Sequence, residues 1–362
     1  MKIIDLIVGT RPNFMKVAPI IKAIDELGAK RRLDYRLIHT GQHYDNLMSG
    51  QFFDQLEIPV PNVNLGIKIG TQISQVAEIL CRYEAILSEK PCDICLVVGD
   101  VTSTMAAAIT AQKMQIKVGH IEAGLRSGDW KMPEEINRLI TDSISNYFFT
   151  TSEEANQNLH REGVGAERVF FVGNTMIDTL LSNREKFKQP DFWNDCALSE
   201  GGYVLLTLHR PQNVDCFDSL KAILQKVADS AQGNPIIFPI HPRTRKKLDG
   251  CDSLFSEIVF VDPLPYLEFG FLSKNARVII TDSGGITEEA TVNRTPCITL
   301  RNSTERPETV ALGTNEVIGH DFERLQQLVY EAFQGKWKTS CIPALWDGGA
   351  GKRIVRLLGQ LI

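Results

Sequence analysis

The sequence lacks the features that mark a membrane-spanning, exported or nucleic-acid-binding chain. Its longest apolar runs are the size of a β-strand, so none could cross a bilayer as a helix. Residues 1–8 have the character of a strand and not the pattern of a signal peptide. A formal net charge of −5 argues against nucleic acid or an acidic membrane as the main partner. A polyanionic ligand would therefore need a few local cations and backbone amides.

Cysteine is present but is not organised into a framework. The eight cysteines are scattered, and Cys92 and Cys95 form a C-x-x-C pair that opens a strand. No second C-x-x-C completes a zinc site, and the spacing does not resemble a small secreted disulfide scaffold. We therefore expect no metal and a reducing, cytoplasmic location.

Short, continuously apolar runs alternate with longer helical patterns along the 362 residues. Runs of this kind are typical of parallel strands that are buried on both faces. The pattern predicts an α/β protein with two Rossmann-like, doubly wound domains. Helices are expected near residues 15–27, 71–87 and 218–230. Strands are expected at residues 3–8, 35–39, 94–98, 118–122, 147–150, 169–172, 203–207, 236–239, 258–261, 278–281, 297–299 and 316–318.

The domain boundaries follow from this alternation. The first domain is expected over residues 1–180 and the second over residues 200–345. A polar stretch, residues 182–202, is expected to link them. The alternating strands and helices of the second domain are then complete. We therefore expect the last helix, within residues 350–362, to return to the first domain.

Loops that follow strands carry the chemistry, because ligands of open parallel sheets bind at the carboxyl ends of the strands. In the first half, Arg11 and Lys16 follow a strand and a glycine, whereas a G-x-G-x-x-G fingerprint is absent. Asp100 follows the third strand, although a helix N-cap would explain it equally well. Glu122 ends an apolar strand, where an unpaired carboxylate would be costly. Glu134 could simply be favoured by the positive end of the dipole of the following helix.

The second half supplies groups for an anion. His209 and His241 each follow a strand and are each accompanied by arginine. The turn Ser283-Gly284-Gly285 lies between a strand and a helix, where backbone amides can face a phosphate. Carboxylates in one half and anion binders in both fit a diphosphate-linked sugar.

These segments, in this order, resemble the UDP-N-acetylglucosamine 2-epimerase family over nearly the whole chain. The resemblance implies a GT-B type of fold with the active site in the cleft between the domains. It also implies a homodimer, a UDP-sugar substrate, and no redox cofactor or required metal. Polysaccharide-precursor supply is the expected pathway. The matching segments begin at Gly9, Gly99, Gly119, Pro133, His209, Asp282 and Thr304.

The resemblance also assigns roles residue by residue. Gln42 and His43 match part of the allosteric pocket of bacterial members. The catalytic positions match Asp100, Glu122, Glu134 and His209. Substrate and UDP contacts match Arg11, Lys16, Arg138, His241, Ser283, Gly284, Gly285 and Glu289, the last of these at the ribose.

Several alternatives stay open. Asn13 stands where many members have an acid, and the segment from His209 to Asp215 follows a variant seen in relatives that act on modified sugars. A 2-epimerase of a UDP-2,3-diacetamido uronic acid is therefore an alternative, as is a hydrolysing enzyme that releases N-acetylmannosamine. From other classes, a GT-B glycosyltransferase and an inactive nucleotide-sugar sensor are the rivals.

Overall fold

The computed structural model describes residues 1–28, 32–41, 53, 55–67, 70–248 and 255–362, apart from the side chains of residues 242 and 243. These residues form two compact units. The first unit comprises Met1–Ser182 and Ala344–Ile362, and the second comprises Asn183–Pro343. Among the described residues, no helix combines the length and hydropathy that a membrane span requires.

The first unit is built on a parallel sheet in the order β3-β2-β1-β4-β5-β6-β7, counted over the described residues. Strands β2 and β3 lie on one side of β1, and strands β4 to β7 lie on its other side, which is the doubly wound Rossmann order. The strands are β1 (Lys2–Val8), β2 (Leu33–His39), β3 (Val63–Asn64), β4 (Ile94–Val98), β5 (Lys117–Ile121), β6 (Tyr147–Thr150) and β7 (Val169–Phe171).

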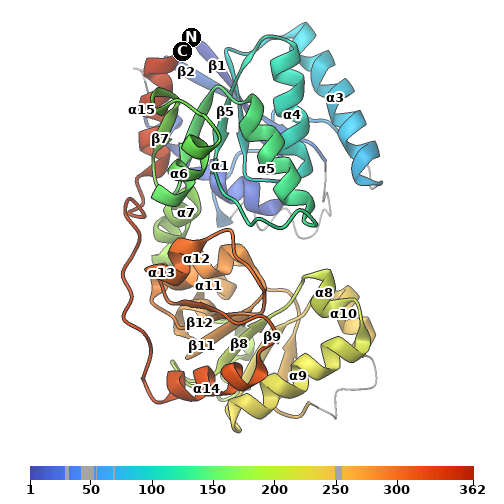
Figure 1. Ribbon diagram of the computed structural model, residues 1–362, viewed down its shortest axis with the longest axis vertical. Coiled ribbons are helices and arrows are strands. Elements are labelled where there is room, and N and C mark those ends of the chain that lie inside the picture. Colours follow the sequence, from blue (N-terminus) through green and yellow to red (C-terminus); the bar gives the residue numbers. More distant parts are fainter. Residues whose placement is uncertain (29–31, 42–52, 54, 68–69, 249–254) are drawn as a thin grey trace. The chain divides into compact units, whose positions relative to one another are not determined.

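Helices cover both faces of this sheet, as right-handed crossovers require (Figure 1). Helix α4 packs between α3 and α5, and α1 packs against the C-terminal helix α15. The helices are α1 (Arg11–Asp25), α3 (Gln72–Glu89), α4 (Thr102–Lys113), α5 (Pro133–Ile144), α6 (Glu153–Arg161), α7 (Thr175–Asn183) and α15 (Ala350–Leu361), with a short 3₁₀ turn η2 (Ala166–Arg168).

The second unit repeats the plan with the strand order β10-β9-β8-β11-β12-β13 in its described part. The two doubly wound sheets expected from the sequence are confirmed. The strands are β8 (Val204–Thr207), β9 (Ile236–Pro239), β10 (Ile258–Val261), β11 (Val278–Thr281), β12 (Cys297–Thr299) and β13 (Asn315–Val317). The helices are α8 (Pro211–Val214), α9 (Phe217–Ala231), α10 (Pro242–Arg245), α11 (Tyr266–Asn275), α12 (Gly284–Asn293), α13 (Pro307–Ala311) and α14 (Phe322–Phe333), with 3₁₀ turns η3 (Arg184–Lys186), η4 (Asp191–Trp193) and η5 (Lys246–Leu248).

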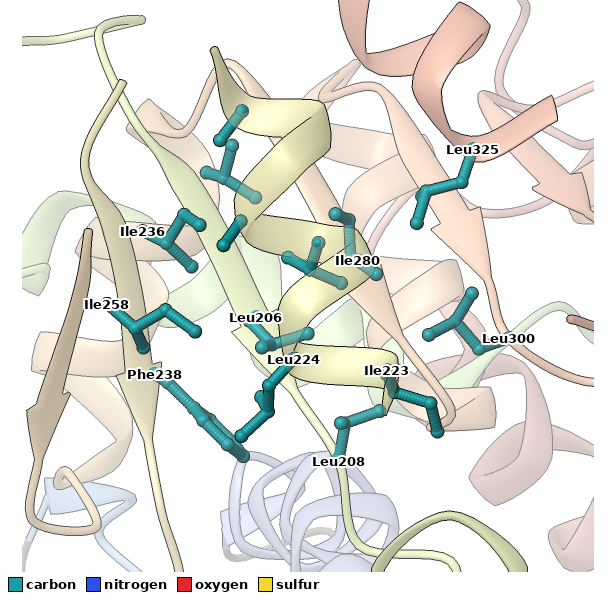
Figure 2. Close-up of a cluster of buried hydrophobic side chains, with 14 of the residues drawn as sticks. Leu206, Leu208, Ile223, Leu224, Ile236, Phe238, Ile258, Ile280, Leu300 and Leu325 are labelled. Carbon is teal, nitrogen blue, oxygen red and sulfur yellow. The ribbon is translucent and has the colours of Figure 1, made fainter. Parts of the chain in front are cut away.

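One hydrophobic core cluster of the second unit lies between this sheet and the helices α9 and α14. Figure 2 shows Ile223 and Leu224 of α9 packed over strand residues that include Leu206, Phe238 and Ile280. All five side chains are at most 2% exposed. Burying a large aliphatic or aromatic side chain contributes roughly 1.5–3 kcal/mol, so this cluster fixes the sheet on which the strand-end loops stand.

The stretch expected as a linker, residues 182–202, is largely a structured part of the second unit. Trp193 is 7% exposed, and its ring meets Tyr203 and Phe271 edge to face at 5.6 and 5.2 Å between centroids. The prediction of a polar linker over this whole range was therefore wrong. Its polar residues lie in turns around the aromatic cluster.

The first helix also differs from expectation, because α1 begins at Arg11 and not at residue 15. The Asn13 side-chain oxygen accepts hydrogen bonds from the backbone N–H of Gly9 and Thr10, both at 3.1 Å. Pro12 suits the first helical turn because it has no N–H, and an N–H at this position would have no intrahelical acceptor. These groups start the helix directly after β1 and bring Arg11 and Lys16 close to the strand end.

The chain end belongs to the first unit. Helix α15 packs on α1, and the Asp178 carboxylate of α7 accepts hydrogen bonds from the Ala350 and Gly351 N–H at 3.1 and 2.7 Å. Burial raises the pKa of Asp178 to about 6. The Trp346 indole donates to the Thr151 carbonyl at 3.0 Å and fixes the segment that leads into α15.

Candidate active site

Asp100 stands at the carboxyl end of β4, in the turn before α4. The N-cap of α4 is Val101, so the alternative of Asp100 as a helix cap was wrong. The Arg138 guanidinium donates to Asp100 Oδ2 at 2.5 Å, and Asn137 Nδ2 donates to the Asp100 backbone carbonyl at 2.8 Å. The side chain is 28% exposed. The carboxylate is therefore oriented by α5 and still open to a ligand.

Glu122 follows β5 and is not part of the strand, which ends at Ile121. Its backbone has φ 71°, a left-handed conformation that is uncommon for a residue with a side chain. The Glu122 carboxylate is 6% exposed and forms an ion pair with Lys16 of α1. A Cβ placed on Gly99 would lie 3.0 Å from Glu122 Oε2 and 3.3 Å from Lys16 Nζ. Glu122, Lys16 and the turn of Asp100 therefore share one site.

The two neighbouring acids at the start of α5 have different surroundings. Glu135 is buried and accepts from the backbone N–H of Ser127 and Gly128 and from the Arg138 guanidinium. Although burial acts to raise it, these donors hold the pKa of Glu135 below its usual value. Glu134 is half-buried, and no partner of its carboxylate lies in the described ranges. Of the two acids, Glu134 is the one available to a ligand.

The β1–α1 turn carries a second cation. Arg11 is the first residue of α1, and burial lowers the pKa of its guanidinium. Asn13 does more than hold the turn, because its Nδ2 donates to the Val98 carbonyl at the end of β4 at 3.0 Å. The amide at this position thus joins the turn that carries Arg11 to the strand that precedes Asp100.

In the second unit, His209 and Asp282 follow the neighbouring strands β8 and β11. His209 Nδ1 lies 2.6 Å from Asp282 Oδ1, and the imidazole is 56% exposed. Asp282 is fully buried and also accepts from the Asn213 side chain and the Arg210 backbone N–H. Although burial acts to raise it, His209 and then these two donors hold the pKa of Asp282 below its usual value. Asp282 begins one of the segments that carry the family resemblance, but the sequence indicated no role for it.

The turn Ser283-Gly284-Gly285 leads from Asp282 into α12. Ser283 is the N-cap residue, so the first amides of the helix point out of its positive end, where an anion is favoured. Two turns further on, Glu289 is 4% exposed, and Tyr266 donates to it at 3.3 Å. Burial raises the pKa of Glu289 to about 7.

Two further residues that follow strands of this sheet are His241 and Arg210. His241 is exposed after β9, the strand that pairs with β8. Arg210 has a buried Nε that lacks a hydrogen-bond partner in the described part of the chain. An arginine directly after a strand is the sequence signal that could have singled out Arg210.

The structure therefore brings together Asp100, Glu122, Lys16 and Arg138 in the first unit. In the second unit it brings His209 close to the turn Ser283-Gly284-Gly285, which we call the anion turn. Gln42 and His43, the candidate allosteric residues, lie outside the described residues. Within the described ranges, no group of three His, Cys, Asp or Glu side chains could hold a metal ion.

A model of the UDP-N-acetylglucosamine 2-epimerase family matches residues 25–359. The UDP-N-acetylglucosamine 2-epimerase of Methanocaldococcus jannaschii is 42% identical, with 98% of each chain covered. The chain belongs to the UDP-N-acetylglucosamine 2-epimerase family.

Solved structures agree with this assignment. The Methanocaldococcus jannaschii UDP-GlcNAc 2-epimerase in complex with UDP-GlcNAc and UDP has a TM-score of 0.87, covering 99% of this chain and 100% of that chain. Together with the two doubly wound sheets, this similarity confirms the expected GT-B type of fold. A relative named for a different UDP-sugar substrate is also similar to this chain. The UDP-2,3-diacetamido-2,3-dideoxy-D-glucuronate 2-epimerase of Pseudomonas aeruginosa is 39% identical, with 88% of each chain covered.

Proposed function

We propose that this epimerase interconverts UDP-N-acetylglucosamine and UDP-N-acetylmannosamine without releasing the free sugar. The observation that carries the proposal is the set of carboxylates at the strand ends of the first unit. Asp100 and Glu122 are each paired with a cation, and Glu134 is open beside them. A glycosyltransferase would need the nucleotide-binding groups but not three acids. Intact acids and an intact His209 also speak against an inactive sensor.

The chemistry explains why acids and anion binders are both needed. No carbonyl group activates the proton on carbon 2 of the sugar, so its direct removal would be slow. When UDP leaves carbon 1, positive charge develops on the ring and the carbon 2 proton becomes removable. The products of this elimination are 2-acetamidoglucal and bound UDP. Protonation on the other face of carbon 2, followed by return of UDP, gives the epimer.

We assign the leaving diphosphate to His209, Arg11 and the amides of the Ser283-Gly284-Gly285 turn. Preorganised donors of this kind stabilise charge that develops in the transition state. Glu289 accepts from the ribose hydroxyls, and His241 and Arg138 contribute further contacts. Asp100, Glu122 and Glu134 serve the oxocarbenium-like centre and the two faces of carbon 2.

A second candidate is a 2-epimerase of a UDP-2,3-diacetamido uronic acid. The 39% identity to the Pseudomonas aeruginosa enzyme favours it, as does the segment His209 to Asp215. Within that segment Asn213 is fully buried, donates to Asp282 at 2.9 Å and accepts from His320 Nε2 at 3.0 Å. Asn213 therefore shapes the surroundings of His209, and the segment can influence the sugar that is accepted.

The test is incubation with UDP-N-acetylglucosamine in D₂O, followed by proton NMR. We expect UDP-N-acetylmannosamine to appear and deuterium to enter carbon 2 of both epimers. Free N-acetylmannosamine together with UDP would show a hydrolysing enzyme instead. An unchanged spectrum, with turnover of the diacetamido uronic acid, would favour the second candidate. UDP binding without turnover of either sugar would contradict the proposal.

We further propose a homodimer in the cytoplasm that supplies precursors for polysaccharides. Helix α3 presents Ile73, Ala77, Cys81 and Ala85 to the outside of the chain, and Ile73 is 79% exposed. Their spacing of four residues places them on one face of the helix, which suits a partner subunit. Light scattering should give about twice the 40.5 kDa of one chain, and Ile73→Glu should reduce that mass.

A further inference from the structure

The imidazole of His120 lies fully buried in β5 between two acceptors. His120 Nδ1 is 2.6 Å from Asp142 Oδ1 on α5, and His120 Nε2 is 2.8 Å from the Gly99 carbonyl oxygen at the end of β4. Both His120 and Asp142 are at most 2% exposed. The ring therefore bridges a helix and the turn that carries Asp100.

The second oxygen of Asp142 is occupied by donors. Asp142 Oδ2 accepts from the Gly124 N–H at 3.1 Å and from Arg126 Nη1 at 2.7 Å. A carboxylic acid placed there would lose charge-assisted bonds, so the ionised form is favoured. Although burial acts to raise it, His120 and Arg126 hold the pKa of Asp142 below its usual value.

The geometry then determines where the ring protons are. A backbone carbonyl can only accept, so Nε2 carries a proton. Because Asp142 is ionised, Nδ1 donates as well. The charges also balance, since Arg126 forms a second ion pair with Glu162 and the four side chains hold two positive and two negative charges. A buried charge is tolerated where it is paired and hydrogen-bonded in this way.

This cluster holds the turns on which the acids of the site stand. The Gly99 carbonyl directly precedes Asp100, and Gly124 follows Glu122 by two residues. Asp142 contacts one turn through His120 and the other directly. A neutral ring would leave one of its two contacts without a proton, and the turns of Asp100 and Glu122 would no longer be tied together.

We propose that His120 is held as a doubly protonated imidazolium and that, with Asp142, it is a positioning residue for Asp100 and Glu122. The positioning role rests on the proposed function, whereas the protonation state concerns the resting protein alone. Two measurements therefore separate the two parts.

The first measurement is the NMR spectrum of the ring N–H groups in resting protein labelled with ¹⁵N-histidine. We expect two protected N–H signals from one imidazole, both absent in His120→Gln and both present in His160→Gln. His160 lies on α6 at the surface and is the matched control. In Asp142→Asn the amide can donate to Nδ1, so one of the two signals should disappear. A single ring N–H signal from His120 in the unsubstituted protein would overturn the inference.

The second measurement is epimerase kinetics. His120→Gln should lower kcat by about a hundredfold, because small misplacements of reacting groups cost rates of this size. UDP affinity should change little, because most of the groups that we assign to the diphosphate lie in the second unit, and His160→Gln should behave as the unsubstituted enzyme. Asp142→Asn gives the same test with a nearly isosteric side chain if His120→Gln does not fold. A folded variant of either residue with normal kcat would refute the positioning role. An unsubstituted protein that turns over no UDP-sugar would refute the proposed function and leave the NMR result valid.

Discussion

His209 Nδ1 and Asp282 Oδ1 lie 2.6 Å apart, and Asp282 is fully buried whereas the imidazole is half exposed. Because the carboxylate occupies Nδ1, the other ring nitrogen, Nε2, is left to face a ligand. The same aspartate accepts from the backbone of Arg210 and directly precedes Ser283. One carboxylate thus orients the histidine next to the turn that we assign to the diphosphate.

Asp282→Asn should therefore lower kcat by about a hundredfold, the scale of one acid–base or charge-stabilising group. The amide lacks the negative charge of the carboxylate and can present its N–H group to the imidazole, so it does not orient the ring as Asp282 does. Asp321→Asn is the matched control, because Asp321 is an exposed N-cap of α14 and asparagine caps equally well. Steady-state kinetics give the kcat of both variants for comparison with the unsubstituted enzyme. Unchanged turnover in Asp282→Asn would show that the pair has no part in the reaction.

Asp100→Asn and Glu122→Gln should each cut turnover at least about a hundredfold while UDP binding is retained. The reason is that neither acid is among the groups that we assign to the diphosphate, most of which lie in the second unit. Calorimetric titration with UDP and initial rates measure the two properties separately. Glu89→Gln, at the exposed end of α3, is the control for the charge change. Either acid would leave the catalytic set if its variant turned over normally.

The positions of most strands could be predicted from the sequence because their runs are continuously apolar. The two-residue strand β3 was missed because Val63 and Asn64 give no periodic signal. The prediction for residues 182–202 was wrong because most of these residues are polar. Trp193 lies among them but is buried against residues that are distant in the sequence.

The site shows a similar limit. Strand ends in the sequence identified Asp100, Glu122 and His209, but side-chain partners depend on packing between elements. The left-handed backbone of Glu122, whose N–H donates to the Phe149 carbonyl in β6, is not visible in the sequence. The same holds for the anchoring role of Asp282, which accepts from the His209 N–H in the turn after β8. Likewise, Glu134 and Glu135 look alike in sequence, and only the fold separates the open acid from the buried one.

Glu289 should make UDP binding depend on pH near neutrality. Burial raises the pKa of Glu289 to about 7, so part of the resting protein is protonated there. If the ribose hydroxyls donate to the carboxylate, UDP binds the ionised form. UDP affinity should then rise as pH increases from 6 to 8, and binding should release a proton. Calorimetry in two buffers of different ionisation enthalpy measures that proton. Glu289→Gln should release none, and Glu323→Gln, exposed on α14, should behave normally.

The same group should affect stability with the opposite trend. A carboxyl group whose pKa is raised in the folded state stabilises the protein fully at pH values below its pKa in the unfolded chain. This contribution is lost as the pH rises through about 7, the pKa of Glu289 in the folded protein. Relative to Glu289→Gln, the free energy of unfolding without UDP should therefore fall between pH 5 and pH 8, by at most roughly 3 kcal/mol. Urea denaturation at both values is the measurement. A constant difference between the two proteins would contradict the raised pKa.

Two glycines in α15 give opposite predictions for the same substitution. A Cβ on Gly351 would lie 2.7 Å from the Pro19 carbonyl oxygen of α1, whereas a Cβ on Gly359 would meet nothing within 4 Å. Gly351→Ala should therefore force α15 away from α1 and destabilise the first unit by about 1–3 kcal/mol. Gly359→Ala should stabilise by about 0.5–1 kcal/mol, because alanine is the better helix former. Thermal and urea unfolding compare the two variants. Equal effects would mean that the close approach of α15 to α1 is not what requires glycine at position 351.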